Sequence, residues 1–233
     1  SRLSHVVPDY WRGSASLASR IMTSSANWHN DSRGFDQFEW VRDLRAFGGS
    51  QARSRARQLI ESWIDSNNNW RAGSWQPDIM GQRVANLVFC YDWCASSAPE
   101  DFQAKLTRSI ARQTRCLALD WPRLYDQTAQ LTALKGLFVG QSAFGANPDD
   151  LAALLDLVLP LVDQVIQADG GHKSRMPDIH LKLTRDLVEI HNAAFSSGVE
   201  TAAQLDKKIS QMASICRMWR HADGQFARFN GAG

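Results

Sequence analysis

The chain has 233 residues, of which 44% are apolar and 21% are charged, and its formal net charge is +2. This length is enough for one large domain or two small ones with a well-buried core, and the composition is that of an ordinary globular protein. The small net charge, with basic and acidic residues interleaved, argues against a nucleic-acid-binding protein.

No apolar segment reaches the roughly 18–20 residues that a membrane-spanning helix needs. The longest segment, 151–166, is interrupted by Asp156, Pro160 and Asp163. The chain begins with Ser1 and no signal-peptide pattern follows, which indicates a processed or excised chain.

The cysteines lack the spacing of a zinc site. They are Cys90, Cys94, Cys116 and Cys216. Because Cys90 and Cys94 are four residues apart, they suit one face of a helix. We therefore expect buried free thiols, and we predict neither a metal nor a cofactor.

The first part of the chain shows helical periodicity and no convincing alternating strand pattern. A first helix is expected over 10–23, after Asp9 as a possible cap. A second is expected over 35–47, because apolar residues recur there at three-residue steps until Gly48-Gly49. Ser50 can cap the third helix, and a polar loop over 65–75 follows it.

Prolines mark the helix starts in the rest of the chain. Helices are expected to open at Pro77, Pro99, Pro122 and Pro148. Pro160 should kink the last of these. Helices over 178–196 and 201–221 bring the total to about nine, and short connections predict antiparallel hairpins. Four irregular hairpins without a residue-level repeat favour a closed toroid over an open solenoid.

Four segments, in order, carry a resemblance to a known family. They are GFDQFEWVRDLR at 34–45, WQPDIMGQRVAN at 75–86, DGGHKSRMP at 169–177 and RHADGQFARFNG at 220–231. Each resembles a segment of the heparinase II/III polysaccharide lyases, and with their spacing they cover almost the whole chain from about residue 30 onward.

This resemblance implies a fold in which an N-terminal (α/α) toroid is followed by an antiparallel β-sandwich. We therefore predict an all-α, incomplete (α/α) toroid of helical hairpins over 1–233. Residues 222–233 would begin the linker to a C-terminal β-sandwich domain that this sequence lacks. The resemblance also implies a periplasmic or extracellular location, while the cysteine usage suits the cytoplasm equally well.

The chemistry that the resemblance implies is β-elimination in a uronate-containing polysaccharide. One group neutralises the sugar carboxylate, a base removes the C5 proton, and an acid protonates the leaving oxygen. Family members use an Asn or His for neutralisation and a Tyr or His for proton transfer. In this chain Ile179 stands where that tyrosine would be, and Arg123-Leu124 stands near the Asn-His pair. Both substitutions count against lyase activity.

Other residues can take these roles, and the candidate catalytic residues are His172, Arg175, Tyr125 and His180. His172 follows two glycines that allow a tight turn, which projects its imidazole from a loop. Lys173 and Arg175 beside it can neutralise or bind a carboxylate. The alternative is a surface loop with solvated cations, in which His180 merely caps a helix.

The candidate substrate-binding residues are Trp75, Asp78, Arg83, Trp121, Arg123 and Lys173. Arg83 lies five residues after Asp78, so the two can pair or face a cleft together, with Trp75 as a stacking platform. Alternatively, Trp75 belongs to the core and the ion pair fixes a helix start. Trp121 precedes Pro122-Arg123 at the mouth of a helix.

Three hypotheses follow for the function. The leading one is a polysaccharide lyase-like domain that acts on an acidic polysaccharide. The alternative is a non-catalytic glycan-binding or scaffold toroid that has lost the chemistry. The third is a glycoside hydrolase, which needs two carboxylates roughly 5–10 Å apart, with Asp78 and Asp126 as candidates. Expected partners are the polysaccharide and the β-sandwich domain of the same protein, with no nucleic acid and no membrane span.

Overall fold

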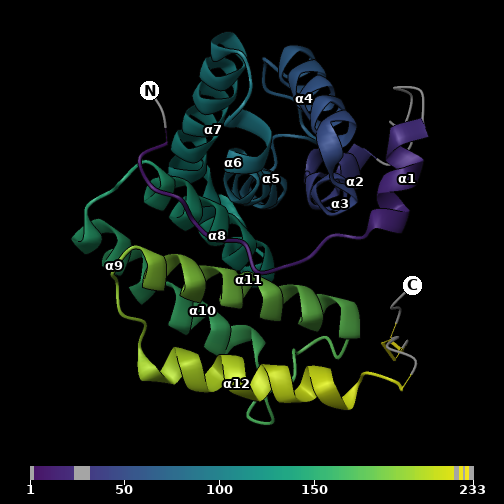
Figure 1. The fold of residues 1–233 in the computed structure, drawn as a ribbon. Coiled ribbons are helices and arrows are strands. Elements are labelled where there is room, and N and C mark those ends of the chain that lie inside the picture. The colour runs from purple at the N-terminus through teal and green to yellow at the C-terminus, as the bar shows by residue number, and fades with distance from the viewer. Residues whose placement is uncertain (1–2, 24–31, 223–225, 228, 231–233) are drawn as a thin grey trace.

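A computed structural model gives the fold and describes residues 3–23, 32–222, 226–227 and 229–230 (Figure 1). The described residues contain helices, loops and two isolated β-bridges but no strand, which confirms the predicted all-α class. The α-helices are α1 (Ala15–Thr23), α2 (Ser32–Asp36), α3 (Trp40–Phe47), α4 (Gly49–Ser66), α5 (Pro77–Phe89), α6 (Tyr91–Ala95), α7 (Glu100–Asp120), α8 (Gln127–Ala143), α9 (Pro148–Asp156), α10 (Val158–Val165), α11 (Pro177–Ser196) and α12 (Ala203–Met218). A short 3₁₀ helix, Trp121–Arg123, precedes α8.

Helices α3, α5, α8 and α11 form an inner layer in which all four run in the same direction. Later residues of one helix contact later residues of its neighbour. Glu39 contacts Gln82 and Arg45 contacts Phe89, while Thr132 contacts Asp186 and Ser142 contacts Ser197. Figure 1 places α5 and α8 in the middle of the molecule, between α4 and α7 on one side and α11 and α12 on the other. The starts of these four helices therefore share one face, which we call the inner-helix face.

The outer helices run back against the inner ones. In α7, Gln113 contacts Arg83 and Thr107 contacts Tyr91, so α7 is antiparallel to α5. Helix α12 likewise returns along α11, and α9 and α10 return along α8. These are the antiparallel hairpins that the short connections predict.

Two glycines allow α5 and α8 to cross at backbone contact. A Cβ on Gly81 would lie 2.5 Å from the Thr132 carbonyl oxygen, and a Cβ on Gly136 would collide with the backbone of Gly81. Most residues of these two helices are buried as a result. One continuous apolar cluster joins them to the outer helices.

Several expected boundaries were wrong for local reasons. Helix α1 begins at Ala15 rather than near residue 10, because the Asp9 carboxylate binds Arg42 and Arg45 instead of capping a helix. The helix expected over 35–47 is interrupted between α2 and α3, where Phe38 has a φ of 63°.

Two expected starts also differ. Helix α4 begins at Gly49 without a side-chain cap, so Ser50 has no capping role. Pro122 lies in the 3₁₀ helix, and α8 begins only after Asp126, whose carboxylate accepts two backbone N–H bonds. The predicted kink at Pro160 is a break at Leu157 between α9 and α10, because proline has no N–H for the Asp156 carbonyl.

Candidate functional site

The structure brings two predicted segments together on the inner-helix face. The turn at 169–175 packs against the start of α8, where His172 Nε2 lies 3.0 Å from Thr128 Oγ1. Lys173 Nζ donates to Gln127 Oε1 at 3.0 Å. Tyr125, just before α8, is 97% exposed. Residues separated by about 45 positions in the sequence thus share this corner of the face.

His172 and His180 are buried and hydrogen-bonded at both ring nitrogens. His180 Nε2 donates to the Met212 carbonyl at 3.0 Å, and its Nδ1 accepts from the backbone N–H of His172 at 3.3 Å. His172 Nδ1 accepts from the backbone N–H of Ser174, which leaves its Nε2 to donate to Thr128. Both pairings suit a neutral imidazole.

The electrostatics agree with this reading of the two rings. Burial lowers the pKa of His180, and burial together with the nearby His180 and Lys173 lowers the pKa of His172. Only 3% of His172 is exposed, and His180 has no exposed surface. Neither imidazole is therefore exposed on the surface where a sugar could bind. Instead, the two candidate proton-transfer histidines connect the turn at 169–175 to α8 and α12.

Arg175 folds back on its own turn. Its guanidinium donates to Asp169 at 2.7 Å, and its φ of 56° is in the left-handed region. The pKa of Asp169 is lowered mainly by a hydrogen bond from the backbone N–H of Gly171, and further by the hydrogen bond from the Arg175 side chain. A ligand carboxylate would have to compete with Asp169 for this cation.

Trp121, Arg123 and Asp126 complete the same corner. Trp121 is half-buried in the 3₁₀ helix, and Arg123 forms an exposed ion pair with Asp120 at 2.9 Å. Asp126 accepts from the backbone amides of Thr128 and Ala129. Its carboxylate therefore serves the helix start rather than the second position of a glycosidase pair.

Trp75, Asp78 and Arg83 do not form a common binding cluster. Arg83 is fully buried and donates to the side chain of Gln113 and to the carbonyls of Asp36 and Ser74, at 2.6–2.8 Å. Burial lowers the pKa of Arg83, and the guanidinium lies 4.2 Å from the Trp63 ring. Arg83 thus connects α5 to α7, to the end of α2 and to the loop before α5.

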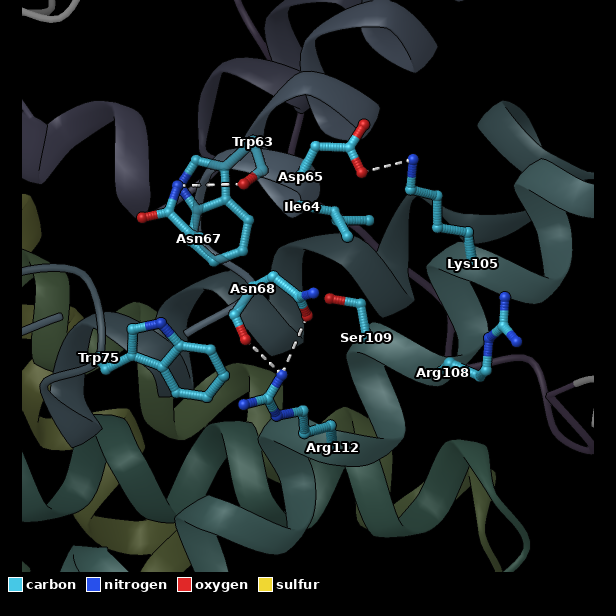
Figure 2. Close-up of a pocket in the computed structure, with 10 residues that line it drawn as sticks. All are labelled: Trp63, Ile64, Asp65, Asn67, Asn68, Trp75, Lys105, Arg108, Ser109 and Arg112. Carbon is cyan, nitrogen blue, oxygen red and sulfur yellow. Dashed lines mark hydrogen bonds and ion pairs between the residues drawn. The ribbon is translucent and has the colours of Figure 1, made fainter. Parts of the chain in front are cut away.

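The other two members are placed differently. Asp78 is half-buried in the first turn of α5. Trp75 is 6% exposed and lines a pocket between α4 and α7 (Figure 2).

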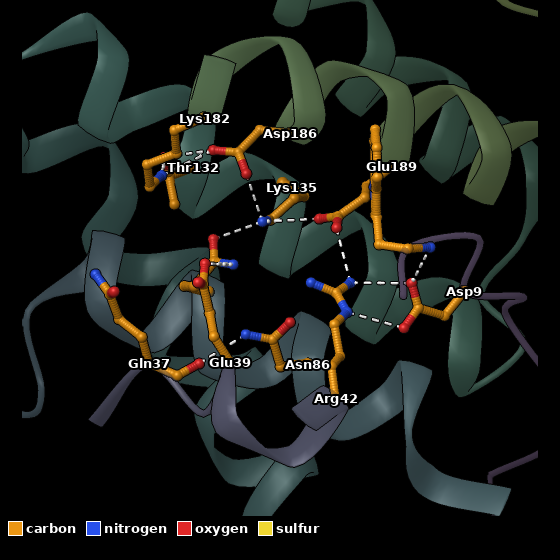
Figure 3. Close-up of polar contacts among 12 residues, drawn as sticks. Asp9, Gln37, Glu39, Arg42, Asn86, Thr132, Lys135, Lys182, Asp186 and Glu189 are labelled. Carbon is orange, nitrogen blue, oxygen red and sulfur yellow. Dashed lines mark hydrogen bonds and ion pairs between the residues drawn. The ribbon is translucent and has the colours of Figure 1, made fainter. Parts of the chain in front are cut away.

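A buried charge network at the centre of the inner layer was missed from the sequence (Figure 3). Lys135 Nζ lies within 2.6–2.9 Å of Gln82, Asp186 and Glu189. Arg42 joins Glu189 to Asp9, at 2.7 and 2.8 Å. Lysine in the apolar segment LTALKGLFVG of α8 was the available sequence signal.

The network reaches the inner-helix face through Lys182. This side chain is 38% exposed, and its ammonium donates to Thr132 at 2.7 Å and to Asp186 at 3.0 Å. Burial by itself raises the pKa of Asp186, but Lys135 and Lys182 outweigh it and lower that pKa. Lys182 and Lys173 therefore give this face two amino groups at its surface.

Within the described ranges, no group of three or more His, Cys, Asp or Glu side chains is placed to hold a metal ion. In the same ranges, no helix combines the length and apolarity that crossing a bilayer requires. All four cysteines are free thiols, and burial raises the pKa of Cys90 to about 12.

Comparison with solved structures defines the class of fold. A crystal structure of heparinase III superposes with a TM-score of 0.67 and 13% identity, covering 96% of this chain and 40% of that one. Heparan sulfate lyase HepC from Pedobacter heparinus gives a TM-score of 0.59 and 12% identity, over 88% of this chain and 34% of that one. The chain has an all-α fold like the helical toroid domain of heparinase III.

Among curated proteins, FtsZ-localized protein C of Caulobacter vibrioides is 31% identical over 195 residues, or 84% of this chain. The chain spans about a third of that relative's length, 34%. No protein-family model matches the sequence.

Proposed function

We propose that this chain binds an acidic polysaccharide on the inner-helix face and does not cleave it. The observation that carries the proposal is the state of the two histidines. Both are buried, neutral and hydrogen-bonded at both ring nitrogens, so neither is free to move a proton at a sugar. The isoleucine at position 179 and Arg123-Leu124 further support a loss of the lyase chemistry.

Affinity for an anion would come from lysines rather than from helix dipoles. Asp78, Asp126 and Asp178 lie at the starts of α5, α8 and α11, where their charges already offset the positive ends of these helices. Lys173 remains as an exposed amino group, whereas Lys182, 38% exposed, shares its ammonium with Asp186. Tyr125, almost fully exposed beside Lys173, offers an aromatic face to a sugar ring.

The test combines a binding assay with a cleavage assay on the full chain. Heparin-type and alginate-type polymers are titrated by calorimetry at two salt concentrations, and ultraviolet absorbance is followed for unsaturated products. We expect saturable binding that weakens with salt, because exposed charges are screened, and no absorbance change. Product formation would contradict the loss of catalysis and support a lyase.

Variants locate the site. Tyr125→Ala together with Lys173→Ala should weaken binding several-fold, since both side chains are exposed and neither supports the core. Lys207→Ala, an exposed lysine on α12, is the matched control and should bind normally. Equal weakening by the double variant and by the control would mean that binding is non-specific charge attraction, and it would contradict the proposed site.

A second candidate role rests on the sequence relative. Because that protein is named for its localisation with FtsZ and is 31% identical to this chain, we propose that the protein containing this chain also localises with FtsZ. A fluorescent fusion imaged beside labelled FtsZ tests this. Coincident bands at the division site are expected, and diffuse fluorescence in dividing cells would count against the role.

A further inference from the structure

The pocket between α4 and α7 is separate from the corner formed by 121–128 and 169–175. It has a volume of about 340 Å³ and is lined by α4, by the loop after it, by Trp75 and by one face of α7 (Figure 2). The polar and aromatic residues that line it include Asn68, Trp75, Lys105, Arg108, Ser109 and Arg112. This volume lies at the small end of the range for ligand sites.

Trp75 supplies a buried polar atom without a partner. The side chain is 6% exposed, and in the described part of the chain its Nε1–H has no hydrogen-bond acceptor. Arg112 lies 4.9 Å from the ring centroid and donates to the backbone carbonyl of Asn68 at 2.6 Å. The Trp75 nitrogen has less than 1 Å² of accessible surface, so the indole ring rather than its N–H lines the pocket.

The acceptors that line the pocket are already in use. Asn68 Oδ1 accepts from Arg112 at 3.2 Å, and Asn67 Oδ1 accepts from the Ser74 hydroxyl at 3.1 Å. Asp65 forms an ion pair with Lys105 at 2.7 Å. A ligand that relied on donating hydrogen bonds would find few unoccupied acceptors here.

The unused groups are donors. Among the side chains that the structure describes, the exposed Arg108 guanidinium makes no ion pair or hydrogen bond. The Ser109 hydroxyl accepts from Gln113, which leaves its own proton available. A site of donors favours a ligand rich in acceptors, and an anion above all.

Charge and geometry narrow the class of anion. Lys105 is matched by Glu61 and Asp65, whereas neither Arg108 nor Arg112 has a carboxylate partner within the described ranges. Two uncompensated cations suit a group with a charge near −2, which a phosphate monoester carries at neutral pH. A carboxylate carries one charge and offers two oxygens, and a sulfate ester also carries one charge.

We propose that this pocket binds the phosphate group of a small phosphate monoester. Arg108 binds the phosphate oxygens as a forked donor, and Arg112 adds positive charge while it holds the loop at Asn68. The Ser109 hydroxyl supplies a further donor, and the Trp75 ring lines the pocket beside Arg112. The site is independent of the proposed polysaccharide face, which uses Tyr125 and Lys173.

The test uses calorimetry and NMR on the full chain. Glucose 6-phosphate and inorganic phosphate are titrated, with glucose 6-sulfate and glucuronate as comparison ligands. The indole resonance of Trp75 is identified by its absence in Trp75→Phe, which removes the N–H and keeps an aromatic ring. We expect saturable binding of glucose 6-phosphate and a shift of that resonance.

Two arginine variants make the test specific. Arg108→Ala should weaken glucose 6-phosphate binding about tenfold or more, as expected for a lost charge-assisted hydrogen bond. Arg115→Ala, an exposed arginine two turns further along α7, should leave it unchanged. An unmoved Trp75 resonance, equal effects of the two variants, or equal binding of glucuronate or glucose 6-sulfate would each overturn the proposal. Polysaccharide binding by Arg108→Ala should be normal, so the two proposals fail separately.

Discussion

Lys135 is a fully buried ammonium group held between two inner helices. Burial by itself lowers the pKa of Lys135, but Asp186 and Glu189 outweigh it and raise that pKa, so the side chain is charged at neutral pH. Moving two or three charges out of water is costly, and the network is tolerated because each charge meets an opposite one at 2.6–2.9 Å.

Removing Lys135 should therefore destabilise the fold strongly. Lys135→Met removes the cation that both carboxylates share, which leaves Asp186 only the partly exposed Lys182 and Glu189 only Arg42. We expect a loss of about 3–5 kcal/mol in the free energy of unfolding, measured by urea denaturation. Lys105→Met is the control, since its partners Glu61 and Asp65 are exposed and should contribute about 1 kcal/mol or less. Similar losses in the two variants would contradict this account of the network.

The two buried histidines predict how stability depends on pH. Because burial holds the pKa values of His172 and His180 below the unfolded value of about 6.5, the unfolded chain binds protons first as the pH falls. The free energy of unfolding should therefore decrease as the pH falls from about 7 through 6.5. His180→Gln should flatten this dependence in urea denaturation series. If the pH dependence of the free energy of unfolding is the same in this variant, it arises from groups other than His180.

At the scale of the helices, the crossing of α5 and α8 depends on Gly81 and Gly136. A methyl group at either position would meet backbone, which cannot rotate away as a side chain can. The two helices would have to separate, and the contacts of their buried residues would loosen with them.

Gly136→Ala should cost about 1–3 kcal/mol of stability through this overpacking, despite the better helix propensity of alanine. Gly73→Ala offers a matched control, because nothing lies within 4 Å of its Cβ and its backbone is not left-handed. The stability of each variant is compared with that of the unchanged chain through the midpoint of urea denaturation. A neutral Gly136→Ala would mean that α5 and α8 do not approach as closely as described.

The sequence predicts helices well where a local chemical signal marks their ends. Pro77 and Pro99 identify the starts of α5 and α7 to within one residue, because proline fixes φ without losing a bonded N–H there. Asp9 misleads for the opposite reason, since an acidic residue before an amphipathic stretch looks like a cap. Its partners Arg42 and Arg45 lie more than 30 residues away and cannot be inferred from spacing.

The same limit applies to the candidate site. The motif at 169–177 correctly draws attention to a turn that meets the start of α8, but spacing does not reveal that the His180 ring accepts a hydrogen bond from the His172 backbone. Arg83 resembles a substrate-binding arginine because arginines are rarely fully buried. Its partners come from three separate segments, and only the packed structure brings these together.

At the scale of the whole molecule, one apolar cluster extends from α1 to α12. We expect a single cooperative transition, with circular dichroism at 222 nm and tryptophan fluorescence giving coincident urea curves. The tryptophans lie across the fold, from Trp11 to Trp219, so fluorescence samples more than one region. Separate transitions by the two probes would show that the hairpins unfold independently.

The charge network also has a consequence for synthesis, because its members leave the ribosome in a fixed order. Arg42 emerges 147 residues before Glu189, and Lys135 emerges 51 residues before Asp186. At roughly 5–20 residues per second, Arg42 waits on the order of ten seconds for Glu189. During that interval Arg42 on α3 can pair only with Asp9, and Lys135 on α8 has neither of its carboxylate partners until α11 is made. The last inner helix, α11, therefore supplies the carboxylates that balance the buried cations as well as the final packing surface.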